Sequence, residues 1–457
     1  MQTSYSPWSA LRALAIVLFL LVNNQAVAAN NEIVGAALGQ LFKSGTVETG
    51  SSTANSSVEA LTAFYASRSF KPVWSRDAGP KGKARALVSE LKRSPVHGLS
   101  PKFYNITEIE RLMASTRPED LARLDMLLTG ALVDFAHNLL NGRISGEQYA
   151  EINAVPPIRI PAAALVDGAA DAGNLRDYIT KLIGEDRRYI RLISKLAEFV
   201  RTEKSGLWPE AKFQDTVTKR NGKHKSIPDL RKVLALSGDL PLDQMNDSEV
   251  LDDKLAASIR IFQERHGLQP TGLVDKALLA EINVPLAARI AQLQLNLERR
   301  RWENKEPAER HVYVNIADES IKLTRSDKTV GLLSLKNTNT LKGVASQYSV
   351  VTEVTIDANS VLSLRFVDQS KENAARDLVI LEQLETAKRN LSALLTANDM
   401  AKIDAARAGS SVTLETPVEL YISYLTAWAV RDGSIQIRAD KFGYDAEIAG
   451  ALKLSGE

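Results

Sequence analysis

One segment, EDLARLDMLLTGALVDFAHNLLN at 119–141, constrains the fold more than any other part of the sequence. Its apolar residues recur every three or four positions, as on one broad face of an α-helix. The residues of that face are Leu121, Leu124, Leu127, Leu128, Ala131 and Phe135. Such a face has to be buried against other elements, so the sequence predicts a helical domain around this helix.

Further helical patterns flank this segment. FYASRSFKPVW precedes Ala84, Leu87 and Leu91 at helical spacing, and HGLSPKFY places a Ser N-cap before a Pro at the first helical position. DRRYIRLISKLAEFVRTEK at 186–204 is a second amphipathic helix, and GLWP at 206–209 then breaks the pattern. We therefore predict a helical domain over 57–225. The stretch 29–56 is rich in Ser, Thr, Gly and Asn, which predicts a flexible leader.

A compact three-helix bundle is predicted for 226–286. PDLRKVLALSGDL, LDDKLAASIRIFQERHG and VDKALLAEINV each have helical spacing, and Gly238 and Gly267 end the first two helices. The expected core residues are Leu234, Leu255, Ile259, Phe262, Leu268 and Leu278. Gln263 and Arg265 are candidates for ligand contact, although a Gln on a helix usually binds solvent or a neighbouring backbone group.

Strand patterns dominate the C-terminal part. After a connecting helix predicted over 287–307, HVYVNIADESIKLTR alternates apolar and polar residues and breaks at Asp318, as a β-hairpin does. TPVELYISYLTAWAVRDGSIQIRADKFG at 416–443 has the same alternation on both sides of an Asp-Gly turn. A helical pattern lies between them at 372–395. The whole chain is thus predicted to be a multi-domain α+β protein, with a mainly β domain over 308–450.

The first residues have the order of a secretory signal. Arg12 precedes an apolar run from Ala13 to Val22, and small residues follow at Ala26 and Ala28. This predicts a signal peptide over 1–28, cleaved after Ala28 or Ala29, and a periplasmic location. The run is shorter than the ~20 apolar residues of a membrane span, so no stable span is expected; a retained anchor is the alternative.

Charge and composition argue against nucleic-acid binding, disulfide bonds and a metal site. Lys+Arg 57 against Asp+Glu 55 gives a net charge of +2, without the basic excess typical of nucleic-acid binders. The basic runs 219–225 and 299–301 are expected to lie on solvated loops or helix faces. The sequence contains no cysteine, so no disulfide can form. His97 and His137 lack a second ligand at metal-binding spacing, and we predict neither a metal site nor a cofactor.

Four segments, in order, resemble those of a known family. FYASRSFKPVW through LDMLLTGALVDFAHNLLNGRIS is similar to the scaffold domain of YcbB-like murein L,D-transpeptidases. LRKVLALSGDL through GLVDKALLAEIN resembles a peptidoglycan-binding three-helix domain. LNLERRRW with HVYVNIADESIKL, and later TPVELYISYLTAW with DGSIQIRADKFGYD, resemble the beginning and end of the family's catalytic sheet. The resemblance covers about Val58 to Tyr444 and implies peptidoglycan as partner.

The catalytic centre departs from that family. The family carries a cysteine nucleophile in a Ser-His-Gly-Cys-x-Arg segment, with another histidine upstream, because a thiolate attacks the peptide stem to form an acyl-enzyme. This chain has no cysteine, and His311, at the start of a predicted strand, is its last histidine. The expected lid and histidine-bearing strand have no counterpart between Val354 and Leu364. We therefore name no catalytic residue, leave the ligand-binding residues unknown beyond those two candidates on the three-helix bundle, and describe 308–450 as a degenerate, shortened transpeptidase-like domain.

The sequence is compatible with three functions. The first is a catalytically inactive peptidoglycan-binding or regulatory homologue, which could also bind another cell-wall enzyme. The second is an active L,D-transpeptidase with a substituted nucleophile, for which the candidate residues are Ser349, Ser360 and Ser363, with Lys342 or Lys371 as base. The third is a structural envelope protein whose helical domains bind protein.

Overall fold

The computed structural model describes residues 31–44, 58–144, 157–209, 213–303 and segments of 310–454. The segments are 310–315, 317–318, 320–325, 328–334, 351–356, 361–366, 411–417, 419–423, 425–430, 433–440 and 443–454. The chain forms two compact units: residues up to 143 with 157–185, and 144–156 with 186–455. The signal peptide predicted for 1–28 and the helix predicted at 372–395 lie outside the described residues.

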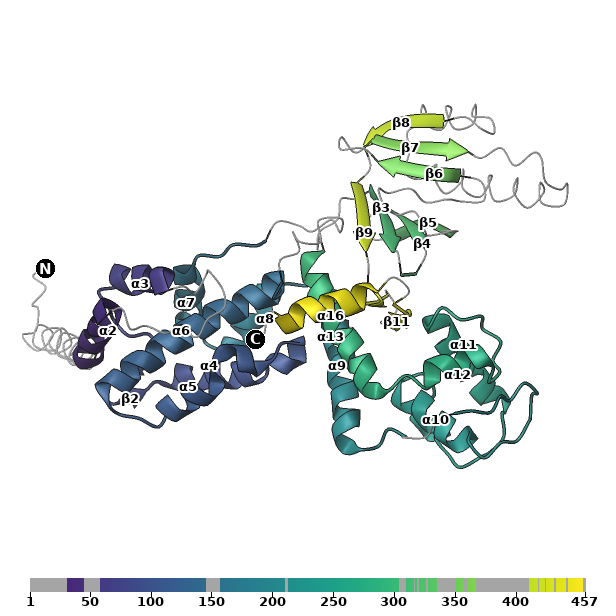
Figure 1. Cartoon of the computed structure of the whole chain (residues 1–457), viewed down its shortest axis with the longest axis horizontal. Helices are drawn as coiled ribbons and strands as arrows, with labels where there is room; N and C mark the ends of the chain where they lie inside the picture. The colour runs from purple at the N-terminus through teal and green to yellow at the C-terminus, as the bar shows by residue number, and fades with distance from the viewer. Residues whose placement is uncertain are drawn as a thin grey trace, which may run out of the picture. The chain divides into compact units, whose positions relative to one another are not determined.

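The first unit is built from helices (Figure 1). They are α2 (Glu32–Ser44), α3 (Val58–Ser67), α4 (Gly82–Lys92), α5 (Ile106–Leu112), α6 (Pro118–Asn141), α7 (Ala162–Asp171) and α8 (Leu175–Ile183). The described residues of this unit also form two short 3₁₀ helices, η2 (Ser94–His97) and η3 (Pro101–Tyr104), and a small antiparallel sheet of β1 (Ser75–Arg76) and β2 (Gly79–Pro80).

The central helix of this unit is α6, which confirms the helix predicted at 119–141. Every residue from Leu124 to Ala136 is buried. A helix that is buried all round its circumference lies inside a core rather than on its surface. The other helices are thus arranged around α6.

Asp125 on α6 holds the segment that follows α3. Its carboxylate accepts hydrogen bonds from the backbone N–H groups of Val73 (2.8 Å), Trp74 (2.8 Å) and Ser75 (2.7 Å), and from the hydroxyl of Tyr65 (2.8 Å). Burial raises the pKa of this carboxyl, and these hydrogen bonds counter the rise. Because a buried carboxylate without partners is costly, Asp125 fixes the path of the chain through FKPVWS.

The flexible leader predicted for 29–56 is wrong for its first half. Residues 32–44 form α2, in which Val34 and Leu38 are fully buried. The Asp77 carboxylate accepts the backbone N–H of Val34 at 3.0 Å and so caps the helix from a distant part of the sequence. The remainder of the predicted leader, 45–56, lies outside the described residues.

In its described residues, the second unit contains helices and three sheets. The helices are α9 (Arg187–Ser205), α10 (Ile227–Leu236), α11 (Asp253–Arg265), α12 (Lys276–Ile282), α13 (Leu286–Trp302) and α16 (Tyr444–Leu454), with the 3₁₀ helix η5 (Leu242–Gln244). The strands are β3 (Arg310–Asn315), β4 (Ser320–Arg325), β5 (Lys328–Ser334), β6 (Val351–Ile356), β7 (Val361–Phe366), β8 (Ser411–Pro417), β9 (Glu419–Ser423), β10 (Ala427–Ala429) and β11 (Ile435–Ile437).

The predicted hairpins are present, with one change. β3 and β4 pair antiparallel around Asp318, and β10 pairs antiparallel with β11 across the turn that contains Gly433 (φ +97°). The segment TPVELYISYLTAWAV, predicted as the first side of a hairpin, is divided among β8, β9 and β10. β9 pairs parallel with β3, whereas β8 pairs with β7. The sheet orders are β5-β4-β3-β9, β6-β7-β8 and β10-β11.

Helices α10, α11 and α12 share a core with their connecting loops, and we call residues 226–286 the three-helix module. Of the core residues predicted for it, all but Leu268 lie in this core. Leu268 is half-buried, because the chain turns at Gly267 (φ +68°) directly after α11 and leaves it at the edge. Asp252 and Asp275 cap α11 and α12 by accepting N–H groups of their first turns.

The arginine run at 299–301 is buried, which corrects the prediction of a solvated face. Its three residues on α13 form ion pairs within the second unit: Arg299 with Asp445 (2.5 Å), Arg300 with Asp186 (3.0 Å) and Arg301 with Glu298 (3.0 Å). Charge alone does not show whether a basic run faces water; here acids from α13, from α16 and from the residue before α9 surround it. The run at 219–225 does expose Lys219, Lys223 and Lys225, as predicted.

Candidate functional site

The residues considered as catalytic candidates do not form a nucleophile–base pair in the described part of the chain. His311 lies in β3 and Ser363 in β7, which belong to different sheets. Ser349, Ser360, Lys342 and Lys371 lie outside the described residues. His97 ends η2, and its ring lies T-shaped to the Phe135 ring with the two ring centroids 6.3 Å apart, the arrangement of a packing residue.

A Ser–His–Asp trio that was not predicted from the sequence lies before α10. The Ser226 hydroxyl is 2.7 Å from His224 Nδ1, and His224 Nε2 is 3.2 Å from the Asp215 carboxylate. The Ser226 backbone N–H also donates to Nδ1 (3.2 Å), so the imidazole proton is on Nε2. The chemical order of these groups is that of a catalytic triad.

Two properties of the trio favour a structural role. The Asp215 side chain is 63% exposed, so water weakens its hold on the imidazole. The basic nitrogen of His224 already accepts the backbone N–H of Ser226, the residue that precedes α10. The trio therefore orders the loop that leads into α10. A His two residues before a Ser in KHKS was the only local sequence signal for it.

The two candidate ligand-contact residues of the three-helix module are buried. The Gln263 amide donates to Thr271 Oγ1 (2.9 Å) and accepts the Gly272 N–H (2.8 Å), so it stabilises the turn after α11. Arg265 makes a bidentate ion pair with Asp239, at 2.6 and 2.5 Å. Neither side chain is available to a ligand.

A second buried cluster joins α11, α12 and α13. His266 stacks on Phe262 with ring centroids 3.9 Å apart, and its Nδ1 is 3.0 Å from the Glu281 carboxylate, which also pairs with Arg289. Burial lowers the pKa of His266 to about 4. The pKa of Glu281 is lowered to about 2: burial acts in the opposite direction, and the contacts with His266 and Arg289 outweigh it. Because this imidazole is neutral at pH 7, Nδ1 carries the proton that Glu281 accepts.

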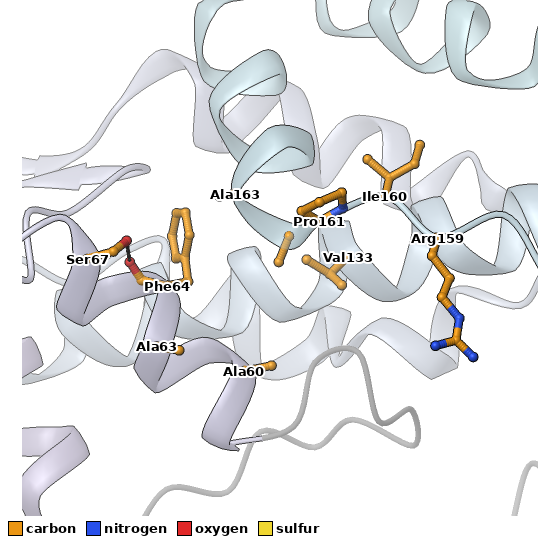
Figure 2. A pocket seen from close by; sticks show the side chains of 10 residues that line it. Ala60, Ala63, Phe64, Ser67, Val133, Arg159, Ile160, Pro161 and Ala163 are labelled. Carbon is orange, nitrogen blue, oxygen red and sulfur yellow. Dashed lines mark hydrogen bonds between the residues drawn. The ribbon is translucent and has the colours of Figure 1, made fainter.

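The first unit has a groove of about 540 Å³ between α3 and the beginning of α7, with Val133 of α6 at its floor (Figure 2). Ala60, Ala63, Phe64 and Ser67 line it from one face of α3 at helical spacing. The Ser67 hydroxyl donates to the Phe64 carbonyl at 2.7 Å. Arg159 is the charged residue of the lining. The walls are thus largely apolar, and this groove holds no pair of nucleophile and base.

No cluster of three His, Cys, Asp or Glu side chains suited to a metal ion occurs among the described residues. Within the same residues, no helix combines the length and apolar character that crossing a membrane requires.

Residues 59–196 match the family model of the Scaffold domain, which is the scaffold domain of YcbB-like proteins. The match begins in α3, includes the groove and all of α6, and ends within α9. No curated protein matches the chain.

Proposed function

We propose that this chain is an exported cell-wall protein related to the YcbB-like murein L,D-transpeptidases, which binds peptidoglycan without thiolate chemistry. The observation that carries the proposal is the match of residues 59–196 to the Scaffold domain. Two further features support it: the three-helix module follows the match in the order that the resemblance implies, and the sequence has no cysteine. The active-enzyme alternative would need a nucleophile, and the one Ser–His contact described above, Ser226 with His224, is better explained as part of the loop before α10.

Peptidoglycan binding is assigned in this proposal to the three-helix module. We expect the protein without its first 28 residues to co-sediment with purified sacculi, and a form lacking residues 228–285 to remain in the supernatant. The near-neutral net charge of +2 argues against simple attraction to an anionic polymer. Binding should therefore persist at moderate salt, where contacts between exposed charges are screened over a Debye length of ~8 Å.

The deletion needs a control for folding. Residues 59–196 are untouched by it, so helical circular dichroism and protease resistance of the first unit should be retained. Equal pelleting of the two forms would assign binding to another part of the chain, and no pelleting of either would remove peptidoglycan as a partner.

We also expect the protein to be catalytically inactive. β-Lactams that acylate L,D-transpeptidases should leave the intact mass of the purified protein unchanged, since no thiolate is available to form the thioester. An active L,D-transpeptidase serves as positive control under the same conditions. An adduct on residues 340–380 would establish a substituted nucleophile. An adduct that Ser226→Ala abolishes would identify the trio before α10 as reactive, and either adduct would overturn this part of the proposal.

A further inference from the structure

The last described hairpin, β10–β11, touches the three-helix module through two arginines. From the module, Arg265 donates through Nη1 to the carbonyl of Ile435 in β11 at 2.6 Å. From the hairpin side, Arg438 donates through Nη1 to the carbonyl of Arg265 at 2.6 Å. One of these hydrogen bonds is donated by the module and the other by the hairpin. Together they hold the end of α11 and the end of β11 in one relative position.

Both guanidinium groups are held in place by other partners. Asp239, which follows α10, binds two nitrogens of Arg265. Asp318, between β3 and β4, accepts from Nε of Arg438 at 2.8 Å, and the same guanidinium lies 5.3 Å from the centre of the Trp428 ring. Hydrogen bonds from charged donors that are already oriented are stronger than those from mobile side chains. The contact is therefore built from preorganised parts.

Gly267 allows the Arg438 side chain to approach the backbone at the end of α11 closely. A Cβ at this position would lie 2.6 Å from Nε and 2.8 Å from Cδ of Arg438, inside van der Waals contact. Its φ of +68° also favours glycine. Glycine at position 267 therefore does more than end α11. It also leaves room for the Arg438 side chain to pack directly on the backbone of the turn.

We propose that Arg265, Gly267 and Arg438 form a latch that docks the β10–β11 hairpin on the three-helix module, so that the two work as one rigid body. The module is then not a tethered binding domain. The latch also occupies the C-terminal end of α11, so any ligand of the module must bind elsewhere on its surface. This inference does not depend on what the module binds, and the test below uses no ligand.

The test is hydrogen exchange on the full chain with Arg438→Met, which keeps much of the side-chain length and removes every side-chain donor. We expect amide exchange to accelerate about tenfold in two separate places, β10–β11 and residues 262–268 at the end of α11, as the loss of charged hydrogen bonds implies. The control is Arg220→Met, close to the module, whose pair with Asp253 is exposed at 51% and 79%; it should leave both regions unchanged.

Gly267→Ala gives an independent test should Arg438→Met fold poorly. Its control is Gly206→Ala, because Gly206 has nearly the same φ (+64°) and a Cβ there would meet no atom within 4 Å. Both substitutions carry the backbone penalty, but only Gly267→Ala should accelerate exchange in β10–β11. Equal hairpin exchange in the two glycine variants, or an Arg438→Met effect confined to the hairpin, would overturn the latch.

Discussion

At the scale of single residues, several buried polar side chains act as structural partners and are not available to contact a ligand. Asp125 organises the segment after α3, and Arg265 and Gln263 are used inside the second unit. His266 is the clearest case with a measurable consequence. It is 5% exposed and neutral, and the groups facing it are Glu281 from α12, Arg289 from α13 and Arg265 from α11.

His266 should make stability depend on pH. Its pKa falls from 6.5 to about 4 on folding, so the unfolded chain binds the proton more tightly. Stability from this group is complete above pH 6.5 and is lost as pH falls toward 4, by roughly 3 kcal/mol at most. His266→Asn keeps an N–H for Glu281 and does not titrate. Denaturant unfolding at pH 7 and pH 4.5 should show a smaller loss for the variant; equal losses would contradict this account.

At the scale of elements, burial decides whether a helical pattern is a surface feature or part of a core. α2 carries only a short apolar pattern within a Ser- and Thr-rich stretch, yet it is fixed by two fully buried residues and by a cap from Asp77. α13 carries a basic run that is surrounded by acids. In both elements a partner comes from a distant part of the sequence.

Leu38→Ala tests whether α2 is part of the first unit. Leu38 is fully buried, and truncation of a buried Leu costs about 2–5 kcal/mol. Ile33→Ala on the same helix is the control, since Ile33 is 58% exposed and should change stability little. Thermal unfolding followed by circular dichroism measures both variants. If the two variants unfolded at the same temperature, α2 would not contribute to the core.

At the scale of the whole molecule, the chain has no cysteine and so no disulfide. Each unit must therefore be stabilised by burial, hydrogen bonds and ion pairs alone. The first unit is built around α6, in which every residue from Leu124 to Ala136 is buried. The second unit joins its helices through buried polar contacts, and the interior Arg–Asp and Arg–Glu pairs of α13 are costly to break because each leaves a charge without its partner. α9, predicted as part of the helical scaffold domain, belongs to this second unit, and the predicted domain boundaries otherwise stay predictions.

The sequence by itself determined the elements whose signals are local. The helix at 119–141, the three helices with their Gly stops, and the hairpins around Asp318 and Gly433 follow from periodicity and turn chemistry. Tertiary structure alone decided which polar residues are buried and what they bind. Arg299 and Arg438 look like ordinary surface cations until Asp445 and Asp318, 146 and 120 residues away, meet them. A contact over such a separation leaves no periodic trace, because it depends on how the elements pack rather than on their own residue pattern.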